Sequence, residues 1–281
     1  MLKVGLIAGI SLTIALAGAE GIATIPVSAQ VLYDGSRNTS FKTQGWVTKT
    51  PQGTIENIFG GGTTLNTTSS NTLQAGYSLF RPLNRTQGYT LSVDLQLLSE
   101  SHASLNRAGF SIIALSSDRR GIELGFWRND PTVRDHIWAQ NDGATRATRF
   151  TRGEGTSFNP SNSLVRYELS IKDNRYGLFA NRNLVLAGNL RDYSIEGIAP
   201  YTLSNVIFLG DNTTSASGSV RITRVALSNT TIPFTTPTSR STRLSAASAT
   251  SVPEPMTIVG SGFAIAMGGL FAKKRQSRGR K

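Results

Sequence analysis

Apolar side chains recur at every second position through much of this chain. Between positions 89 and 97 they alternate with Thr, Ser, Asp and Gln, so one apolar and one polar face would form on an extended strand. The same pattern predicts further strands at 110–115, 122–127, 165–171, 176–180, 184–186, 206–209 and 220–227. Helical spacing with caps is absent from any segment longer than a turn or two. The chain is therefore predicted to be all-β.

Turn residues separate several of these strands at short intervals. Asp173-Asn174 and Asn181-Arg182-Asn183 predict an antiparallel meander across 165–186, and Gly210-Asp211 predicts a turn after the strand at 206–209. Many strands at spacings near ten residues are typical of a sandwich or a barrel. About 200 residues remain between the two ends of the chain, which is enough for one well-buried domain.

The N-terminal 29 residues have the pattern of a secretory signal peptide. Lys3 precedes an apolar run at 4–17, and small side chains follow at Val27 and Ala29. Signal peptidase accepts small residues at these positions, so cleavage is predicted between Ala29 and Gln30. We therefore expect the protein to be exported.

The C-terminal 29 residues carry three features in a fixed order. Pro253-Glu254-Pro255 comes first, an uncharged run at 256–272 follows, and a cluster of Lys and Arg ends the chain. The run is just long enough to cross a bilayer as a helix, and the cluster would hold the C-terminal tail in the cytoplasm. The preceding segment, 229–252, is rich in Ser and Thr and is predicted to be a flexible linker.

This tripartite arrangement resembles the PEP-CTERM sorting signal. In that family, a membrane protease called an exosortase is thought to cut near Pro253-Glu254-Pro255 and to release or transfer the protein. The resemblance implies an exosortase-type partner and a location at the cell surface or in an exopolysaccharide matrix, after transient membrane anchoring. The predicted organisation is a signal peptide at 1–29, a β-sandwich domain at 30–228, a linker at 229–252 and a sorting signal at 253–281. A plain membrane anchor is the alternative.

The body resembles concanavalin A-like, laminin-G-like jelly-roll sandwiches between about residues 31 and 228. The resemblance rests on core positions such as Tyr167-x-Leu169-x-Ile171, Tyr176-x-Leu178 and the late Phe208-Leu209-Gly210-Asp211. It implies an antiparallel sandwich, and relatives of this kind include both β-glucanases and glycan-binding domains. Fold alone does not choose between them.

Hydrolysis with retention of configuration needs two carboxylates about 5 Å apart. In this chain the candidates Glu123, Glu168 and Asp94 each stand alone in a strand, and a Gly-x-Ser-x-Gly motif is absent. We therefore expect a protein without catalytic activity, with a glycoside hydrolase-like enzyme as the alternative.

Glycan binding needs an exposed aromatic ring beside polar groups on a rigid strand. Alternation places Glu123 with Trp127, and His136 with Trp138 and Gln140, on the polar side of two neighbouring strands. A hairpin through 129–135 would merge the two sides into one platform. The alternative is that both tryptophans cover an edge of the core.

The composition limits which metals, cofactors and charged partners the chain is expected to bind. The chain has no cysteine and two histidines, which disfavours zinc chemistry, and no cofactor is expected. Calcium stays open as an alternative, with Asp130 and Asp211 as weak loop candidates. The net charge is +12, of which the body from 30 to 253 carries +7, mostly as Arg. Arg suits acidic polysaccharide or lipid headgroups as partners, with a soluble basic surface carrying local ion pairs as the alternative. Without interleaved aromatics no nucleic-acid partner is expected.

Overall fold

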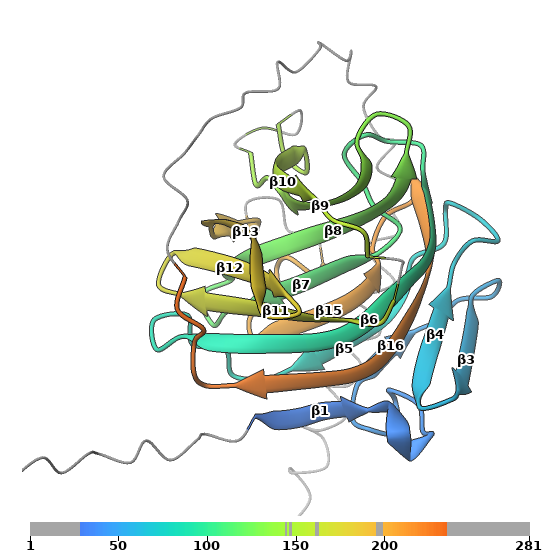
Figure 1. Ribbon diagram of the computed structural model, residues 1–281, viewed down its shortest axis with the longest axis horizontal. Helices are drawn as coiled ribbons and strands as arrows, with labels where there is room; N and C mark the ends of the chain where they lie inside the picture. The colour runs from blue at the N-terminus through green and yellow to red at the C-terminus, as the bar shows by residue number, and fades with distance from the viewer. Residues whose placement is uncertain (1–28, 144, 146–147, 161–162, 195–198, 235–281) are drawn as a thin grey trace, which may run out of the picture.

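Two antiparallel β-sheets packed face to face form the body (Figure 1). The computed structural model describes residues 29–143, 145, 148–160, 163–194 and 199–234. Every strand pair in these ranges is antiparallel. The described residues contain no α-helix, and a short 3-10 turn, η1, covers Gly35–Arg37. The predicted all-β antiparallel sandwich is confirmed.

Sheet A contains the first and last strands of the body. Its order is β13 (Asn183–Asn189), β12 (Arg175–Ala180), β11 (Val165–Lys172), β6 (Tyr89–His102), β16 (Ala216–Ser228), β4 (Gly62–Asn66) and β3 (Ile55–Phe59), with β1 (Gln30–Asp34) paired to β16. The predicted meander is β11-β12-β13, with two-residue turns at 173–174 and 181–182.

Sheet B lies against the other side of the core. Its order is β10 (Arg152–Ser157), β9 (Arg134–Gln140), β8 (Arg120–Asp130), β7 (Ser111–Leu115), β15 (Val206–Asp211), β5 (Ala75–Phe80) and β2 (Val47–Lys49), with β14 (Arg191–Asp192) beside β8. The turn predicted at Gly210-Asp211 is wrong. Both residues continue β15 and pair with Gly76 and Ala75, and Gly210 does so at a φ of 152°, which a side chain would disfavour.

The core between the sheets is built from the apolar set of each alternating strand. Leu91, Val93 and Leu95 of β6 face Ile122 and Leu124 of β8, and all five side chains are buried. Burial of this apolar surface is the main force that holds the sheets together. The opposite side chains of each strand consequently point to the two outer faces of the sandwich.

The chain continues past β16 onto the outer face of sheet A. Residues 229–234, here called the strap, leave β16 and pass over β11 towards β12 (Figure 1). The carbonyl of Thr230 accepts a hydrogen bond from Thr90, and Ser170 both donates to the Ile232 carbonyl and accepts from its N–H. The aromatic ring of Phe234 covers Gly177, where a methyl group would lie 2.7 Å from it. The first residues of the predicted linker are therefore attached to the sheet.

Candidate functional site

The predicted polar and aromatic residues do meet on one face. In the hairpin of β8 and β9, Trp127 pairs with His136 and Gly125 pairs with Trp138. Glu123 and Gln140 continue the same outer face of sheet B, opposite the buried Ile122 and Leu124. The prediction that the two strands merge their polar sides is confirmed.

The exposure that a sugar-stacking platform requires is missing at this place. Trp127 and Trp138 are both 0% exposed and form a small apolar cluster with Ala108. Gly125 leaves no hollow between the two strands, because a methyl group there would lie 2.8 Å from ring atoms of Trp138. The expectation of an open aromatic platform is wrong. Both tryptophans are buried in a cluster separate from the main core, which agrees with the alternative that they cover an edge of the core. Whether the surrounding residues bind glycans stays a prediction.

A second polar group covers the middle of the same face. Glu123 is buried and accepts a 2.6 Å hydrogen bond from the hydroxyl of Tyr201, which in turn accepts one from Asn212. The guanidinium of Arg107 donates to Asn212 and to Gln140, both at 3.2 Å. Burial is the largest cause of a pKa well above the ordinary range for Tyr201, so this hydroxyl stays a donor. The side chains of Glu123 and Gln140 are therefore hydrogen-bonded to the residues that cover sheet B and do not face solvent.

His102 lies at the end of β6 beneath the tryptophans and was not predicted to take part. Its Nδ1 lies 3.0 Å from a carboxylate oxygen of Glu100, and its Nε2 lies 3.2 Å from Asp130. Its ring stacks on Trp127, and the guanidinium of Arg152 lies 4.8 Å from an indole ring centroid of the same tryptophan. Glu100 and His102 are two residues apart in β6, so strand alternation would place them on one face, but their proximity to Asp130 depends on the fold.

His136 occupies a different environment from His102. Its Nδ1 is buried and has no hydrogen-bond partner among the described residues. Burial, together with the nearby charge of Arg152, lowers the pKa of His136 to about 4. This histidine is therefore neutral at ordinary pH.

The two weak calcium candidates, Asp130 and Asp211, use their carboxylate oxygens for hydrogen bonds to other residues of the chain. Asp130 accepts hydrogen bonds from the backbone of Thr132 and Val133, while Asp211 accepts from Thr213 and Thr67. Both aspartates end strands instead of lying in open loops. Within the described ranges, no group of three His, Cys, Asp or Glu side chains is placed to hold a metal ion. Asp130 and Asp211 therefore use their carboxylates for hydrogen bonds within the chain, and calcium stays an open alternative.

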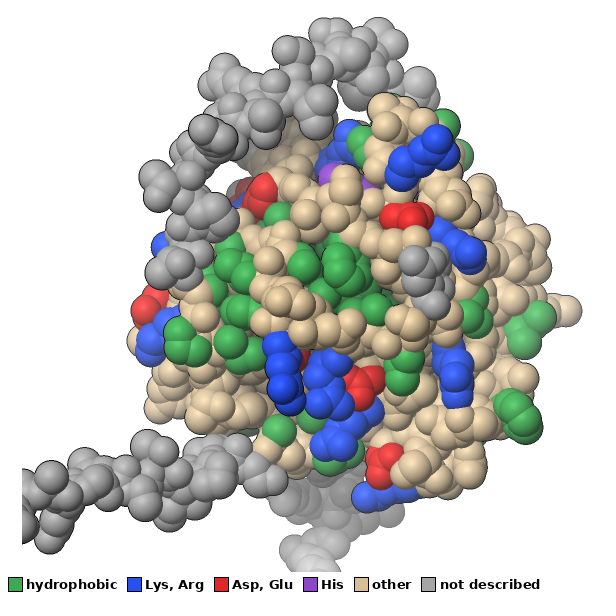
Figure 2. Space-filling model, viewed as in Figure 1, with side chains coloured by type: hydrophobic (Ala, Val, Ile, Leu, Met, Phe, Trp, Pro, Cys, Tyr) green, Lys and Arg blue, Asp and Glu red, His purple; other side chains and the backbone are tan. Residues whose placement is uncertain are grey.

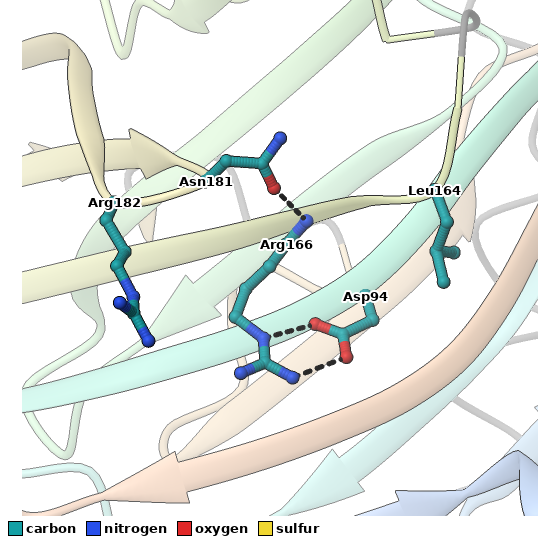
Figure 3. A pocket seen from close by; sticks show the side chains of 5 residues that line it. All are labelled: Asp94, Leu164, Arg166, Asn181 and Arg182. Carbon is teal, nitrogen blue, oxygen red and sulfur yellow. Dashed lines mark hydrogen bonds and ion pairs between the residues drawn. The ribbon is translucent and has the colours of Figure 1, made fainter.

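An open pocket lies instead on the outer face of sheet A (Figure 3). It has a volume of about 300 Å³ and is lined by Asp94, Leu164, Arg166, Asn181 and Arg182. Arg166 donates hydrogen bonds from Nε and Nη2 to the two carboxylate oxygens of Asp94, at 2.7 and 2.8 Å, and so forms a bidentate ion pair. This pair is the main cause of a raised pKa for Arg166. On the face shown in Figure 2, Lys and Arg side chains gather beside acidic ones over β6 and β16.

The pocket owes its position to the β12–β13 turn. Asn181 donates its backbone N–H to the Arg166 carbonyl and accepts the Arg166 N–H through its side chain. These bonds hold the turn beside β11. The turn was predicted from the sequence but the pocket was not, because only strand register places Arg166 opposite Asp94.

The predicted processing residues fall at or beyond the described body. Gln30 begins β1, so the strand starts at the residue after the predicted cleavage point, while cleavage itself stays a prediction. Pro253, Glu254 and Pro255 lie outside the described residues, as does the whole segment at 253–281. Among the residues that are described, no helix has the length and apolar character needed to span a membrane.

The chain matches no protein family model and no curated protein sequence. Its fold is similar to a carbohydrate esterase from the Shiga toxin-encoding bacteriophage phi24B, with a TM-score of 0.50, 12% identity, and coverage of 71% of this chain and 98% of that one. It is also similar to the Emp46p carbohydrate recognition domain, with a TM-score of 0.45, 13% identity, and coverage of 72% and 97%.

A third similar structure is a Bacillus subtilis protein of unknown function with a galectin-like fold. Its TM-score is 0.46 at 10% identity, with coverage of 73% of this chain and 98% of that one. At such identities the likeness concerns the sandwich fold alone. Function has to be argued from the residues of this chain.

Proposed function

We propose that this chain is an exported, non-catalytic protein of the cell surface or extracellular matrix whose sandwich binds carbohydrate. The signal peptide pattern at 1–29 supports export. The resemblance of residues 253–281 to a PEP-CTERM signal supports transient membrane anchoring, with the tail in the cytoplasm, and processing by an exosortase-type protease. The open pocket on sheet A is the observation that supports binding, because it is a concave site with polar groups and one apolar wall.

The positions of the carboxylates favour binding over glycoside hydrolysis. Both carboxylate oxygens of Asp94 accept hydrogen bonds from Arg166, so this carboxylate is already occupied. Glu123 is 1% exposed, bonded to Tyr201, and lies on the other sheet. A glycosidase needs an acid and a base or nucleophile that both reach the substrate. Neither residue meets that requirement.

The histidines give no support to a serine hydrolase either. In a serine triad, one imidazole nitrogen accepts the proton of the serine hydroxyl while the other donates to a carboxylate. Both nitrogens of His102 contact carboxylates, which leaves none for a hydroxyl. His136 has no partner at Nδ1 among the described residues. We therefore favour a binding protein over an esterase.

The proposal is tested by processing and by binding. The full chain is expressed in a bacterium that carries an exosortase, and its termini are determined by intact-mass and terminal-peptide mass spectrometry in membrane and medium fractions. We expect ends at Gln30 and near Pro253. The processed protein is then applied to an array of neutral and acidic polysaccharides, where we expect binding. A chain that still ends at Lys281 in every fraction would contradict sorting, and an array without binding would contradict the carbohydrate function.

A further inference from the structure

The turn beside the pocket adopts a conformation that disfavours its own sequence. Asn181 and Arg182 form a two-residue turn with φ values of 49° and 70°. Glycine is the preferred second residue of such turns, because an L-residue in the left-handed region has its Cβ too close to backbone. Arg182 is exposed, so packing does not explain its presence. Arg119 shares this strain, so the conformation alone assigns no role, and the assignment of Arg182 depends on its place at the pocket.

Two guanidinium groups approach the pocket, that of Arg166 from β11 and that of Arg182 from the β12–β13 turn. The bonds to Asp94 use Nε and one Nη of Arg166, and Figure 3 shows the other Nη on the side of Arg182. Arg182 makes no hydrogen bond or ion pair with any described residue. Asp94 balances one of these two charges, and Glu168, two residues along β11, also acts on Arg166. The side of the pocket next to Arg182 nevertheless keeps a positive charge without a partner in the described chain.

The remaining walls of the pocket suit a sugar ring. Leu164 is 46% exposed and offers an apolar surface for the C–H face of a ring. Asn181 adds an amide at the rim. The planar guanidinium of arginine matches a planar carboxylate and donates two parallel hydrogen bonds to it. A carboxylate on a sugar ring therefore satisfies both the charge and the shape of this pocket.

We infer that the pocket between Arg166 and Arg182 binds the carboxylate of a uronic acid residue in an acidic polysaccharide. This inference rests on the proposed carbohydrate-binding function and assigns its site and sugar class. The carboxylate lies between the two guanidinium groups, and the ring lies against Leu164. Sheet A therefore carries the ligand, while the covered face of sheet B does not.

The test uses one polymer with and without its charge. The full chain is immobilised, and its affinities for polygalacturonate and for methyl-esterified polygalacturonate are measured by biolayer interferometry. Loss of a hydrogen bond to a charged group weakens binding about tenfold or more, so we expect at least that preference for the free acid. Arg182→Gly is expected to remove the preference. Its thermal midpoint should stay unchanged or rise by up to about 3 °C, because glycine relieves the turn.

Arg119→Gly is the matched control. Arg119 is also exposed and also has a left-handed backbone, with φ at 66°, but it lies in the turn between β7 and β8 of the other sheet. This variant loses the same charge and the same strain, but at a position away from the pocket. Its affinity for polygalacturonate should therefore stay within twofold of that of the unmodified chain. An equal loss in both variants would show a general charge effect and overturn the assigned site.

The outcomes separate this inference from the proposed function. Equal binding of both polymer forms, unaffected by Arg182→Gly, would overturn the uronate site and leave carbohydrate binding standing. Binding of dextran sulfate as tight as that of polygalacturonate, and equally dependent on Arg182, would show a general anion site and overturn the carboxylate assignment. A chain that binds neither these polymers nor any neutral polysaccharide would overturn the proposed function itself.

Discussion

The imidazole of His102 lies flat on the indole of Trp127, with ring centroids 4.1 Å apart and ring planes 6° from parallel. Both imidazole nitrogens contact carboxylates, those of Glu100 and Asp130. Burial alone lowers the pKa of His102, but the two carboxylates outweigh it, and the pKa is raised above its ordinary value of 6.5. The folded chain therefore holds this proton more tightly than the unfolded chain does.

The first prediction follows from that raised pKa. Stabilisation by protonated His102 is fully present below about pH 6.5 and is lost as the pH rises through the folded-state pKa, at up to about 1.4 kcal/mol per pH unit. We expect the free energy of unfolding, from urea titrations between pH 6 and 9, to fall with pH. His102→Gln should flatten this fall. A variant with the same slope as the unmodified chain would contradict the assignment.

His136 predicts the opposite dependence on the acid side. Its pKa is lowered to about 4, so the unfolded chain binds the proton more tightly than the folded chain does. The stabilisation is present above about pH 6.5 and is lost as the pH falls towards 4. We expect the unfolding free energy to decrease between pH 6.5 and 5, and the decrease to shrink in His136→Gln. The chain has only these two histidines, so each variant serves as the control for the other.

The two buried tryptophans are predicted to differ in their hydrogen bonds. Trp127 donates its indole N–H to the carbonyl of Arg107 at 2.7 Å, whereas the Trp138 indole nitrogen has no partner among the described residues. Trp127→Phe leaves that carbonyl unpaired, while Trp138→Phe loses no such bond. We expect Trp127→Phe to cost about 1 kcal/mol more than Trp138→Phe in the unfolding free energy. Equal costs in denaturant titrations would count against this view.

The strap predicts a local change without a global one. Ser170→Ala removes both hydrogen bonds to Ile232, so the Ile232 N–H should exchange with solvent at least tenfold faster in hydrogen-exchange measurements. Gly177→Ala should have the same effect, because its methyl group would displace the ring of Phe234. Ser92→Ala, on the same outer face in β6, is the control that should leave this exchange unchanged. Unchanged exchange in all three variants would mean that the strap contacts carry no protection.

Periodicity predicted those strands that are buried on one side. The apolar sets of β6, β8 and β11 alternate, and each strand lies where the pattern placed it. The strand β5 was missed because almost all of its residues are buried, so no alternation marks it. The strand β4 was missed because its Gly and Thr residues carry little apolar signal.

The candidate site was predictable in its register but not in its exposure. Alternation and the loop at 129–135 placed Trp127 beside His136. The side chains that bury them or cover the same face, including Ala108 and Tyr201, come from segments without periodicity. Likewise, the facing of Arg166 and Asp94 joins positions that are 72 residues apart. Such contacts depend on strand order, which a single sequence does not encode in any local pattern.

The attachment of the strap decides how the body responds to a pulling force. Tension applied to the chain beyond Phe234 first meets the contact with Gly177 of β12 and the bonds to Ser170 of β11. Arg166 of the pocket lies on β11 and Arg182 lies in the turn that follows β12, so a tether and a ligand would pull on the same part of sheet A. The central strand β16, which joins β6 to β4 and β1, is spared from being peeled away from its end. The strap contacts would thus bear a pulling force before it reaches β16, the central strand of sheet A.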